Sequence, residues 1–480
     1  MPVFDVIFRD ALIYDGTGAP PRRDSLAITG ERIAAVGSVF PNEAREVVEA
    51  GHLALSPGFI DAHTHDDRIV LDAPEMLPKI SQGVTTVITG NCGISLAPAV
   101  FDDDPPPPMN LLGGAEVYAF PDFATYAAAL RSAAPAVNVA ALIGHSALRL
   151  ATMTDIRRKA NEGEINRMQS MAAEAMASGA AGFSTGLFYP TNAAADRAEV
   201  AAIARCFAAA GGVYATHMRD EFAGVLDSIE ESVATSADAG IRLVISHHKC
   251  AGPANWGRTT ETLPRLEDAA RRQPVNLDVY PYAAGSTNLR QDLVTPDYPI
   301  RISWSKSHPE MTGRMLDDIA AEWSCSLHEA AARLDPAGAI YFQMHEDDVR
   351  RVMCSPIAMI GSDGLPHDAH PHPRLWGTFP RVLGHYARDL ALFSMEEAIH
   401  KMTGLPAHVF GLKGRGSLAP GNYADLVLFD PGAVIDRATY DSPRLMAEGV
   451  SRVYVNGALT FREGGGVAQR AGRLTGGNNI

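Results

Sequence analysis

The sequence predicts an α/β fold, a TIM-like (β/α)₈ barrel with a small β-sandwich domain formed from both termini. Three observations predict it: eight short apolar runs, segments of helical period between several of them, and strand-like patterns at both ends. We expect the small domain to comprise residues 1–56 and 415–480, and the barrel residues 57–414. A chain of 480 residues is long enough to bury both cores.

The two ends of the chain have the pattern of short antiparallel strands. Apolar and polar residues alternate from Val3 to Arg9, and glycine-rich turns interrupt the first fifty or so residues. Residues 423–429 and 451–457 have the same strand-like composition. We therefore expect the two ends to meet in one β domain.

Between the ends lie eight short runs that are apolar or rich in β-branched residues. The runs comprise residues 58–65, 84–93, 138–145, 179–187, 212–218, 242–249, 275–282 and 358–364. Alanine-rich patterns of helical period occupy several intervals, namely residues 123–133, 165–178, 198–210 and 222–239. Strands that alternate with helices in this way favour a parallel barrel.

Two intervals exceed what a minimal barrel requires. Residues 101–121 contain three consecutive aspartates and four consecutive prolines, which predict an extended loop rather than a helix. The interval of about 283–355 is far longer than one helix needs, so we expect an insertion over the barrel mouth. A lid and a simple surface excursion fit this insertion equally well.

Composition restricts the partners that the protein can bind. Lys and Arg number 41 against 56 Asp and Glu, and the net charge of -15 argues against binding nucleic acid or an anionic membrane. We find neither a signal-peptide pattern nor an apolar run of membrane-spanning length, so we expect a cytoplasmic protein that acts on a small molecule. Five scattered cysteines without a C-x-x-C pair indicate a reduced protein. The oligomeric state stays open.

The strongest chemical signal is His63-Thr64-His65 at the end of the first run. Residues two apart in a strand point the same way, so both imidazoles face one side, as a divalent metal site requires. Two surface histidines in a polar loop are the alternative. The other runs favour the metal, because nearly all end in polar residues and the carboxyl ends of barrel strands share the face where active sites form.

Cys92, His217 and His247 end the second, fifth and sixth runs. One thiolate and two imidazoles with an open fourth position are typical of catalytic zinc, although Cys92 taken alone is more typical of a buried structural cysteine. Asp363 ends the eighth run and is the candidate general base. An ordinary Asp-Gly turn is the alternative for Asp363.

The run from Pro57 to His65, the histidines of the fifth and sixth runs, the aspartate of the eighth and the two-ended β domain resemble the amidohydrolase superfamily. This resemblance covers nearly the whole chain. Within the superfamily the chain is similar to the N-acyl-D-amino-acid deacylases (D-aminoacylases). The segments that carry this similarity are residues 90–93, 184–187, 216–219, 246–249, 361–368 and 372–379.

The resemblance implies a tight zinc on Cys92, His217 and His247. His63 and His65 would form a second metal site of low occupancy, to which Cys92 and Asp363 contribute. Cys92 matches the cysteine that this subfamily has where many members bridge two metals with a carboxylated lysine. The implied reaction is hydrolysis of the amide of an N-acyl-D-amino acid, in which Asp363 takes a proton from water and returns it to the amine.

We expect cations and hydroxyls near the barrel mouth to bind the substrate. The likeness to the family makes Lys249 and Arg374 the candidates for the α-carboxylate, together with Tyr189. Tyr280 and Tyr282 supply further hydroxyls. The preference for D-amino acids rests on the resemblance alone.

Arg290 is a cation beyond what one carboxylate needs, and it favours N-acyl-D-glutamate as the substrate. A solvated arginine is an equal alternative, and it leaves broad activity on apolar N-acyl-D-amino acids as the second candidate. A cyclic amide hydrolase of the hydantoinase type would share the histidines but would need the bridging lysine. A noncatalytic barrel would have lost ligands, whereas this chain keeps every expected one.

Overall fold

The computed structural model places an eight-stranded parallel sheet in the middle of the chain and describes residues 3–37 and 44–476. In their order around the sheet, the strands are β6 (Phe59–Asp61), β7 (Val84–Thr89), β10 (Asn138–Gly144), β11 (Gly182–Gly186), β12 (Val213–His217), β13 (Arg242–Ile245), β14 (Val275–Val279) and β18 (Ala358–Ile360). Each of the eight predicted runs contains one strand. The N–H of Ala62 donates to the Ile360 carbonyl at 3.2 Å and Thr64 bridges Gly364, so the sheet nearly closes into the predicted barrel.

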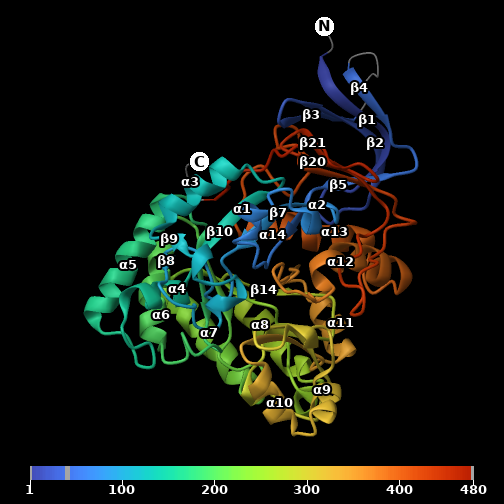
Figure 1. Cartoon of the computed structure of the whole chain (residues 1–480). Coiled ribbons are helices and arrows are strands. Elements are labelled where there is room, and N and C mark those ends of the chain that lie inside the picture. Colours follow the sequence, from blue (N-terminus) through green and yellow to red (C-terminus); the bar gives the residue numbers. More distant parts are fainter. Residues whose placement is uncertain (1–2, 38–43, 477–480) are drawn as a thin grey trace.

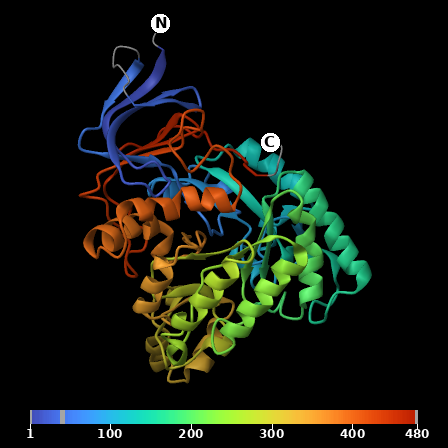
Figure 2. The ribbon, with the colours of Figure 1, turned by 180° about the vertical axis from the view of Figure 1, so that it is seen from behind.

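Helices cover the outside of the barrel, as Figures 1 and 2 show from opposite sides. The longest are α3 (Phe123–Ala133), α5 (Glu162–Ala177), α6 (Arg197–Ala208), α7 (Val225–Ala239) and α8 (Thr259–Ala270). Local sequence sets their starts: the Asn161 side chain accepts from the Glu164 N–H at 2.9 Å, and the Glu164 side chain accepts from the Asn161 N–H at 2.8 Å. This reciprocal cap satisfies two backbone donors at the start of α5.

The inside of the barrel is filled by apolar side chains below the polar carboxyl ends of the strands. Ile60, Ile88, Leu142, Val244 and Met359 belong to this core. The strands are buried on both faces, which explains why they occur in the sequence as continuous apolar runs rather than as alternating patterns.

The two ends of the chain form a mainly β domain, as predicted, and lie side by side in Figures 1 and 2. Its strands are β1 (Phe4–Ile13), β2 (Arg22–Thr29), β3 (Arg32–Gly37), β4 (Ala44–Glu49), β5 (Ala54–Pro57), β19 (Leu426–Phe429), β20 (Val450–Val455), β21 (Ala458–Arg462) and β22 (Gly466–Val467). They make one continuous sheet in which β5 pairs antiparallel with β19 and so joins the two ends. Phe8, Leu26 and Tyr454 contribute to its core. The limits given above for the two domains stay predictions.

Two segments outside the barrel motif lie towards its carboxyl end. Residues 101–121 contain no α-helix; they form the short 3₁₀ turns η2 (Met109–Leu111) and η3 (Ala115–Val117), and β9 (Ala119–Phe120), which pairs with β8 (Ala99–Val100). The predicted insertion holds the strands β15 (Gly285–Asn288), β16 (Ile300–Ser305) and β17 (Ala337–Tyr341) and the helices α9 (Leu316–Glu322) and α10 (Leu327–Leu334). Ile302, Leu334 and Tyr341 give it a core of its own.

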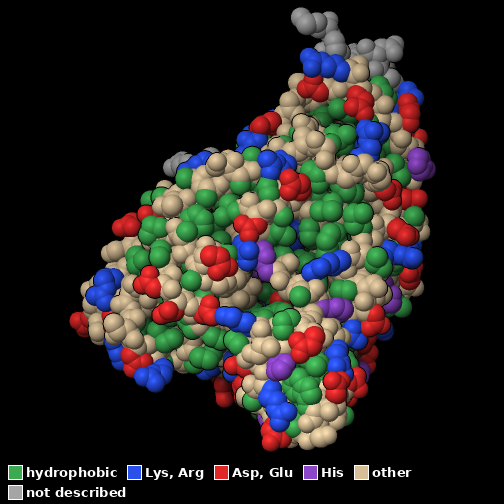
Figure 3. All heavy atoms as spheres, viewed as in Figure 1, with side chains coloured by type: hydrophobic (Ala, Val, Ile, Leu, Met, Phe, Trp, Pro, Cys, Tyr) green, Lys and Arg blue, Asp and Glu red, His purple; other side chains and the backbone are tan. Residues whose placement is uncertain are grey.

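The surface mixes charges of both signs. Figure 3 shows Lys and Arg side chains interspersed with Asp and Glu over one face of the molecule, with hydrophobic side chains between them. On this face neither Lys and Arg nor Asp and Glu form an area of a single charge sign. Within the described residues, none of the helices combines the length and the apolar character that crossing a bilayer requires.

Candidate active site

Six predicted site residues meet at the carboxyl end of the barrel. His63 and His65 follow β6, Cys92 follows β7, His217 ends β12, His247 follows β13 and Asp363 follows β18. Each is at most 7% exposed. The described part of the chain contains three groups of potential metal ligands whose binding atoms lie within 4.8 Å of one another: His63, Cys92 and His247; His63, His65 and Asp363; and His217, Glu221 and His247.

The Cys92 thiol lies between two imidazoles. Its Sγ is 3.3 Å from His63 Nε2 and 3.3 Å from His247 Nε2. Burial opposes ionisation of the thiol, but the two imidazoles outweigh burial and hold the pKa of Cys92 well below its usual value. The cysteine therefore has the charge state of a metal ligand rather than that of an inert buried thiol.

His217 lies on the far side of His247 from this thiol group. The two imidazole centroids are 4.4 Å apart, and Glu221 Oε2 is 3.4 Å from His217 Nε2. Both ring nitrogens of His217 are buried without a hydrogen-bond partner. Burial lowers the pKa of His217 to about 4, so the ring is neutral, the form that binds a metal. The structure thus groups His217 more closely with His247 and Glu221 than with Cys92.

Asp363 is a buried carboxylate with charged groups on both sides. Its Oδ1 is 3.2 Å from His65 Nε2, and its Oδ2 is 2.9 Å from Arg374 Nη1. Burial raises the pKa of Asp363, but Arg374 and His63 outweigh burial and hold the pKa well below its usual value. Asp363 is therefore ionised, as a proton acceptor must be.

A strained backbone supports three of these side chains. Cys92, His247 and Asp363 have φ values of 55°, 37° and 50°, in the left-handed region that residues other than glycine rarely adopt. Each such residue costs about 1–3 kcal/mol, and such strain concentrates at functional sites. The turn that follows each strand thereby aims its side chain into the cluster.

A cavity of about 40 Å³ opens beside these residues, and Lys249, Tyr189, Tyr280 and Asp363 line it. Lys249 Nζ is 2.6 Å from Glu221 Oε1 and 2.8 Å from His247 Nδ1. Among the lining residues of this cavity, Lys249 is the only Lys or Arg.

Three residues predicted to bind substrate lie outside this cavity. Arg374 is fully buried and contacts Asp363, with its guanidinium 4.5 Å from the Tyr280 ring. Tyr282 lines a neighbouring cavity instead, beside Met344 and Val349. The chain turns after β14, where the Tyr282 N–H donates to the Tyr280 carbonyl at 2.9 Å. Arg290 forms two hydrogen bonds with Asp292, at 2.9 and 2.7 Å.

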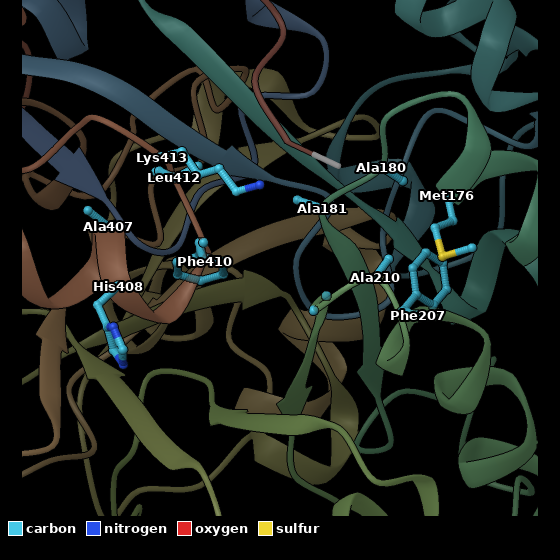
Figure 4. A pocket seen from close by; sticks show the side chains of 13 residues that line it. Met176, Ala180, Ala181, Phe207, Ala210, Ala407, His408, Phe410, Leu412 and Lys413 are labelled. Carbon is cyan, nitrogen blue, oxygen red and sulfur yellow. The ribbon is translucent and has the colours of Figure 1, made fainter. Parts of the chain in front are cut away.

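A cavity of about 350 Å³ lies at the opposite end of the barrel. Ala181 and Gly212, which line it, directly precede β11 and β12, so it opens at the amino ends of the strands. Figure 4 shows Phe207 on one side and Phe410 and His408 on the other. Its lining contains no cysteine or carboxylate, and active sites of such barrels form at the other end. We therefore assign the chemistry to the smaller cavity.

Comparison with known proteins agrees with this geometry. The amidohydrolase family matches residues 46–305 and 308–461. The chain belongs to the amidohydrolase family. It is 51% identical to D-aminoacylase of Alcaligenes xylosoxydans xylosoxydans over 98% of this chain and 97% of that protein. It is 46% identical to N-acyl-D-glutamate deacylase of the same organism, over 95% of this chain and 93% of that protein.

Solved structures of amidohydrolases have the same fold. A crystal structure of D-aminoacylase superposes with a TM-score of 0.96 at 50% identity, covering 98% of this chain and all of the other. N-acyl-D-glutamate deacylase from Bordetella Bronchiseptica, complexed with zinc and a phosphonate inhibitor, gives 0.95 at 46% identity, covering 98% and 99%. These matches confirm the predicted similarity to the N-acyl-D-amino-acid deacylases and the prediction of an enzyme that hydrolyses linear amides.

The sequence analysis missed two carboxylates of this amidohydrolase that contact the histidines. Glu221 contacts His217, His247 and Lys249. Asp278 Oδ1 accepts from the His247 N–H at 2.8 Å, and its Oδ2 is 3.3 Å from His63 Nδ1. Two signals pointed to them: Glu221 lies four residues after His217, and Asp278 is a charged residue inside the buried strand β14. Such partners orient metal-binding imidazoles.

Proposed function

We propose that this amidohydrolase uses zinc to hydrolyse N-acyl-D-amino acids, releasing a carboxylate and the free D-amino acid, and that it prefers apolar side chains. The observation that carries the proposal is the position of Cys92 Sγ, 3.3 Å from two imidazoles and beside the ionised Asp363. The sequence identity of 46–51% to D-aminoacylase and to N-acyl-D-glutamate and N-acyl-D-aspartate deacylases supports the substrate class.

The residues of the site fit a zinc ion. A thiolate and neutral imidazoles are the donors that zinc takes, and both buried ring nitrogens of His217 lack a hydrogen-bond partner, although Glu221 Oε2 lies 3.4 Å from Nε2. Cys92 and His247 would hold the tight ion together with His217, whose ring lies 4.4 Å from that of His247 on the side away from Cys92. His63, His65 and Asp363 would hold a weaker second ion. For D-aminoacylase itself, one-metal activation and second-metal attenuation have been described. A bound zinc supplies a Lewis acid that polarises the acyl carbonyl and lowers the pKa of water.

Asp363 moves the proton. Its carboxylate takes a proton from the attacking water, whose oxygen bonds to the acyl carbon. The bond from carbon to nitrogen then breaks, and Asp363 returns the proton to the departing amine. Arg374, at 2.9 Å, holds the carboxylate in position and favours its charged form.

Lys249 and the two tyrosines bind the amino-acid half of the substrate. Lys249 is the cation in the cavity lining and faces the α-carboxylate. The Tyr189 hydroxyl lies 3.0 Å from Thr287 Oγ1, at the insertion, and Tyr280 closes the same wall. When Lys249 holds the α-carboxylate of the substrate, the orientation of the substrate is fixed, and with it the face of the amide that is turned towards Asp363.

The lining around the cavity favours an apolar side chain on the substrate. Phe188, Leu293 and Tyr341 line the side formed with the insertion. Arg290 lies outside the cavity lining and shares two hydrogen bonds with Asp292, whereas Lys249 lines the cavity. N-acyl-D-glutamate is the second candidate. The Arg290 guanidinium lies 4.1 Å from the ring of Phe188, which lines the cavity, so Arg290 is close to the place where the side chain of the substrate would lie.

Initial rates on paired N-acetyl-D- and N-acetyl-L-amino acids test this proposal with zinc-loaded protein. We expect hydrolysis of the D-leucine, D-methionine and D-phenylalanine compounds at least about tenfold faster than that of D-glutamate or D-aspartate. Arg290→Met should change the rates on apolar substrates little. A preference for D-glutamate that Arg290→Met abolishes would establish the second candidate. Hydrolysis of cyclic amides without any action on these compounds would overturn the proposal.

A further inference from the structure

Two segments outside the barrel motif enclose a groove beside the catalytic cavity. Residues 104–116 form one wall, and the insertion, through Trp304, Lys306 and Pro336, forms the other. The groove measures about 560 Å³, against about 40 Å³ for the cavity at Asp363. Leu111 lines both spaces, so this one side chain borders the cavity on one side and the groove on the other. The cavity at Asp363 is smaller than the sites of about 300–1,000 Å³ that bind small molecules, so the groove offers the additional space that a longer substrate needs.

The walls of the groove are mainly apolar. Pro105 and Pro107 supply rigid apolar surface from one segment, and Trp304 and Pro336 face them from the insertion. The Asn288 side chain at the end of β15 donates to Asn110 Oδ1 at 2.9 Å and ties the two walls together next to Leu111. The groove is therefore a space built by contacts between the segments.

The cations that line the groove, Arg68 and Lys306, have carboxylate partners. Lys306 Nζ is 2.5 Å from Asp104, and Arg68 Nε is 2.6 Å from Asp72. Asp368 also lines the groove, and burial raises its pKa to about 7, which favours the uncharged carboxyl. Both groove cations are therefore paired with carboxylates. Because the surface between these pairs is mainly apolar, we expect an apolar chain to occupy the groove.

Two loops connect the reacting centre with the groove. Arg68 follows His65 by three residues, and Asp368 follows Asp363 by five, so their loops lead from the reacting centre to the groove. Lys249, assigned to the α-carboxylate, follows β13, two strands away from β18 in the sheet. A substrate anchored at Lys249 with its amide at Asp363 directs its acyl group towards Leu111.

We propose that this groove binds the acyl chain of the substrate and that the enzyme prefers straight acyl chains longer than acetyl. The inference rests on the proposed deacylase function and adds the acyl half of its specificity. Each methylene that moves from water into the groove contributes about 0.8 kcal/mol, a factor of about four in kcat/KM. In this proposal Leu111 is the side chain that the acyl chain passes, and Trp304 is the large apolar side chain of the far wall.

A series of N-acetyl-, N-butanoyl-, N-hexanoyl- and N-octanoyl-D-leucine tests the proposal on zinc-loaded enzyme. We expect kcat/KM to rise along the series, so that the ratio of octanoyl to acetyl exceeds about tenfold. The ratio is taken within each variant, which cancels differences in folding or zinc content. Trp304→Ala and Leu111→Phe should each lower it at least about threefold, the former by removing a wall and the latter by narrowing the path of the acyl chain.

Trp323→Ala is the matched control, because Trp323 also belongs to the insertion but lies outside the groove lining. Its octanoyl-to-acetyl ratio should equal that of the wild type. Hydrolysis of N-acetyl-D-leucine with a ratio of one or less, unchanged in Trp304→Ala, overturns the acyl groove and leaves the deacylase function intact.

Absence of turnover on the entire series instead overturns the deacylase function. Calorimetric binding then tests whether the groove binds the acyl chain. The proposal is supported if N-octanoyl-D-leucine binds at least about tenfold more tightly than the acetyl compound and if Trp304→Ala loses this gain. Equal affinities overturn it.

Discussion

Asp363 combines burial, negative charge and a left-handed backbone. Its N–H donates to the His63 carbonyl at 2.8 Å, and φ is 50°. These contacts hold the carboxylate between His65 and Arg374. An Asp-Gly turn on the surface would have neither the ion pairs nor the burial, so the structure favours the catalytic alternative of the two that the sequence left open.

Asp363→Asn should lower kcat at least about a hundredfold, because an amide cannot accept the proton of the attacking water. The tight zinc should remain, since Cys92, His217 and His247 are unchanged. Initial rates and zinc content measured on the same preparation check this prediction. A variant with one zinc and near-wild-type turnover would remove Asp363 from the mechanism, and Asp102→Asn on the surface serves as the control.

Asp368 should make stability depend on pH. Burial raises the pKa of Asp368 to about 7 in the folded protein, against about 3.9 in an unfolded chain. Between these values the unfolded chain releases the proton and the folded protein keeps it, so the free energy of unfolding falls as pH rises. Asp368→Asn carries no charge and should gain about 2–4 kcal/mol relative to wild type between pH ~4.5 and ~8.

Thermal unfolding at pH ~4.5 and at pH ~8 measures the effect of Asp368 on stability. The difference in Tm between Asp368→Asn and wild type should become more positive at the higher pH. Asp102→Asn, which alters an exposed carboxylate, should show the same difference at both values. A pH-independent difference for Asp368→Asn would contradict the prediction.

The short helix α2 (Leu77–Ile80) stabilises the place where the barrel closes. Its Lys79 is buried and donates from Nζ to Asp61 Oδ2 at 2.8 Å and to Ser362 Oγ at 2.6 Å. Asp61 ends β6 two residues before His63, and Ser362 directly precedes Asp363. One ammonium therefore joins the two strand ends that carry the HxH pair and the candidate base.

Lys79→Met should lower the free energy of unfolding by about 3–5 kcal/mol, because it leaves Asp61 buried without its charged partner. Urea unfolding measures the loss. Lys159→Met is the control: its pair with Asp196 has a lysine side chain that is 69% exposed, and such surface pairs contribute about 0–1 kcal/mol. Equal losses in the two variants would show that Lys79 does not stabilise the closure.

Zinc should stabilise the whole barrel, because its proposed ligands come from strand ends far apart in the chain. Cys92 follows β7, whereas His217 and His247 belong to β12 and β13. A ligand that binds only the folded state at 1,000 times its Kd adds about 4 kcal/mol to stability. Tm should therefore rise with zinc and fall with a chelator, and Cys92→Ser should lose most of this response. Identical Tm values with and without zinc would contradict the prediction.

Local patterns in the sequence predicted much of the fold. The barrel strands appear as continuous apolar runs because both faces of each strand are buried. The helix predicted over residues 165–178 begins earlier, at Glu162, because the Asn161 side chain caps it. The helix predicted from residue 222 begins instead at Val225, since the Asp220 side chain accepts from the Phe222 and Gly224 N–H groups and forms a turn there. Such turns depend on side-chain geometry that periodicity does not contain.

The chain's periodicity and motif spacing alone determined the barrel and the two-ended β domain, because these signals are local, and they placed the proposed metal ligands at strand ends. Tertiary structure decided how charges pair: His63 meets Asp278, 215 residues away, and Arg374 contacts Asp363 rather than the cavity. It also paired Arg290 with Asp292 and placed the groove at Leu111. A buried charge must find a partner, and which partner lies within reach depends on the packing of segments that are distant in sequence.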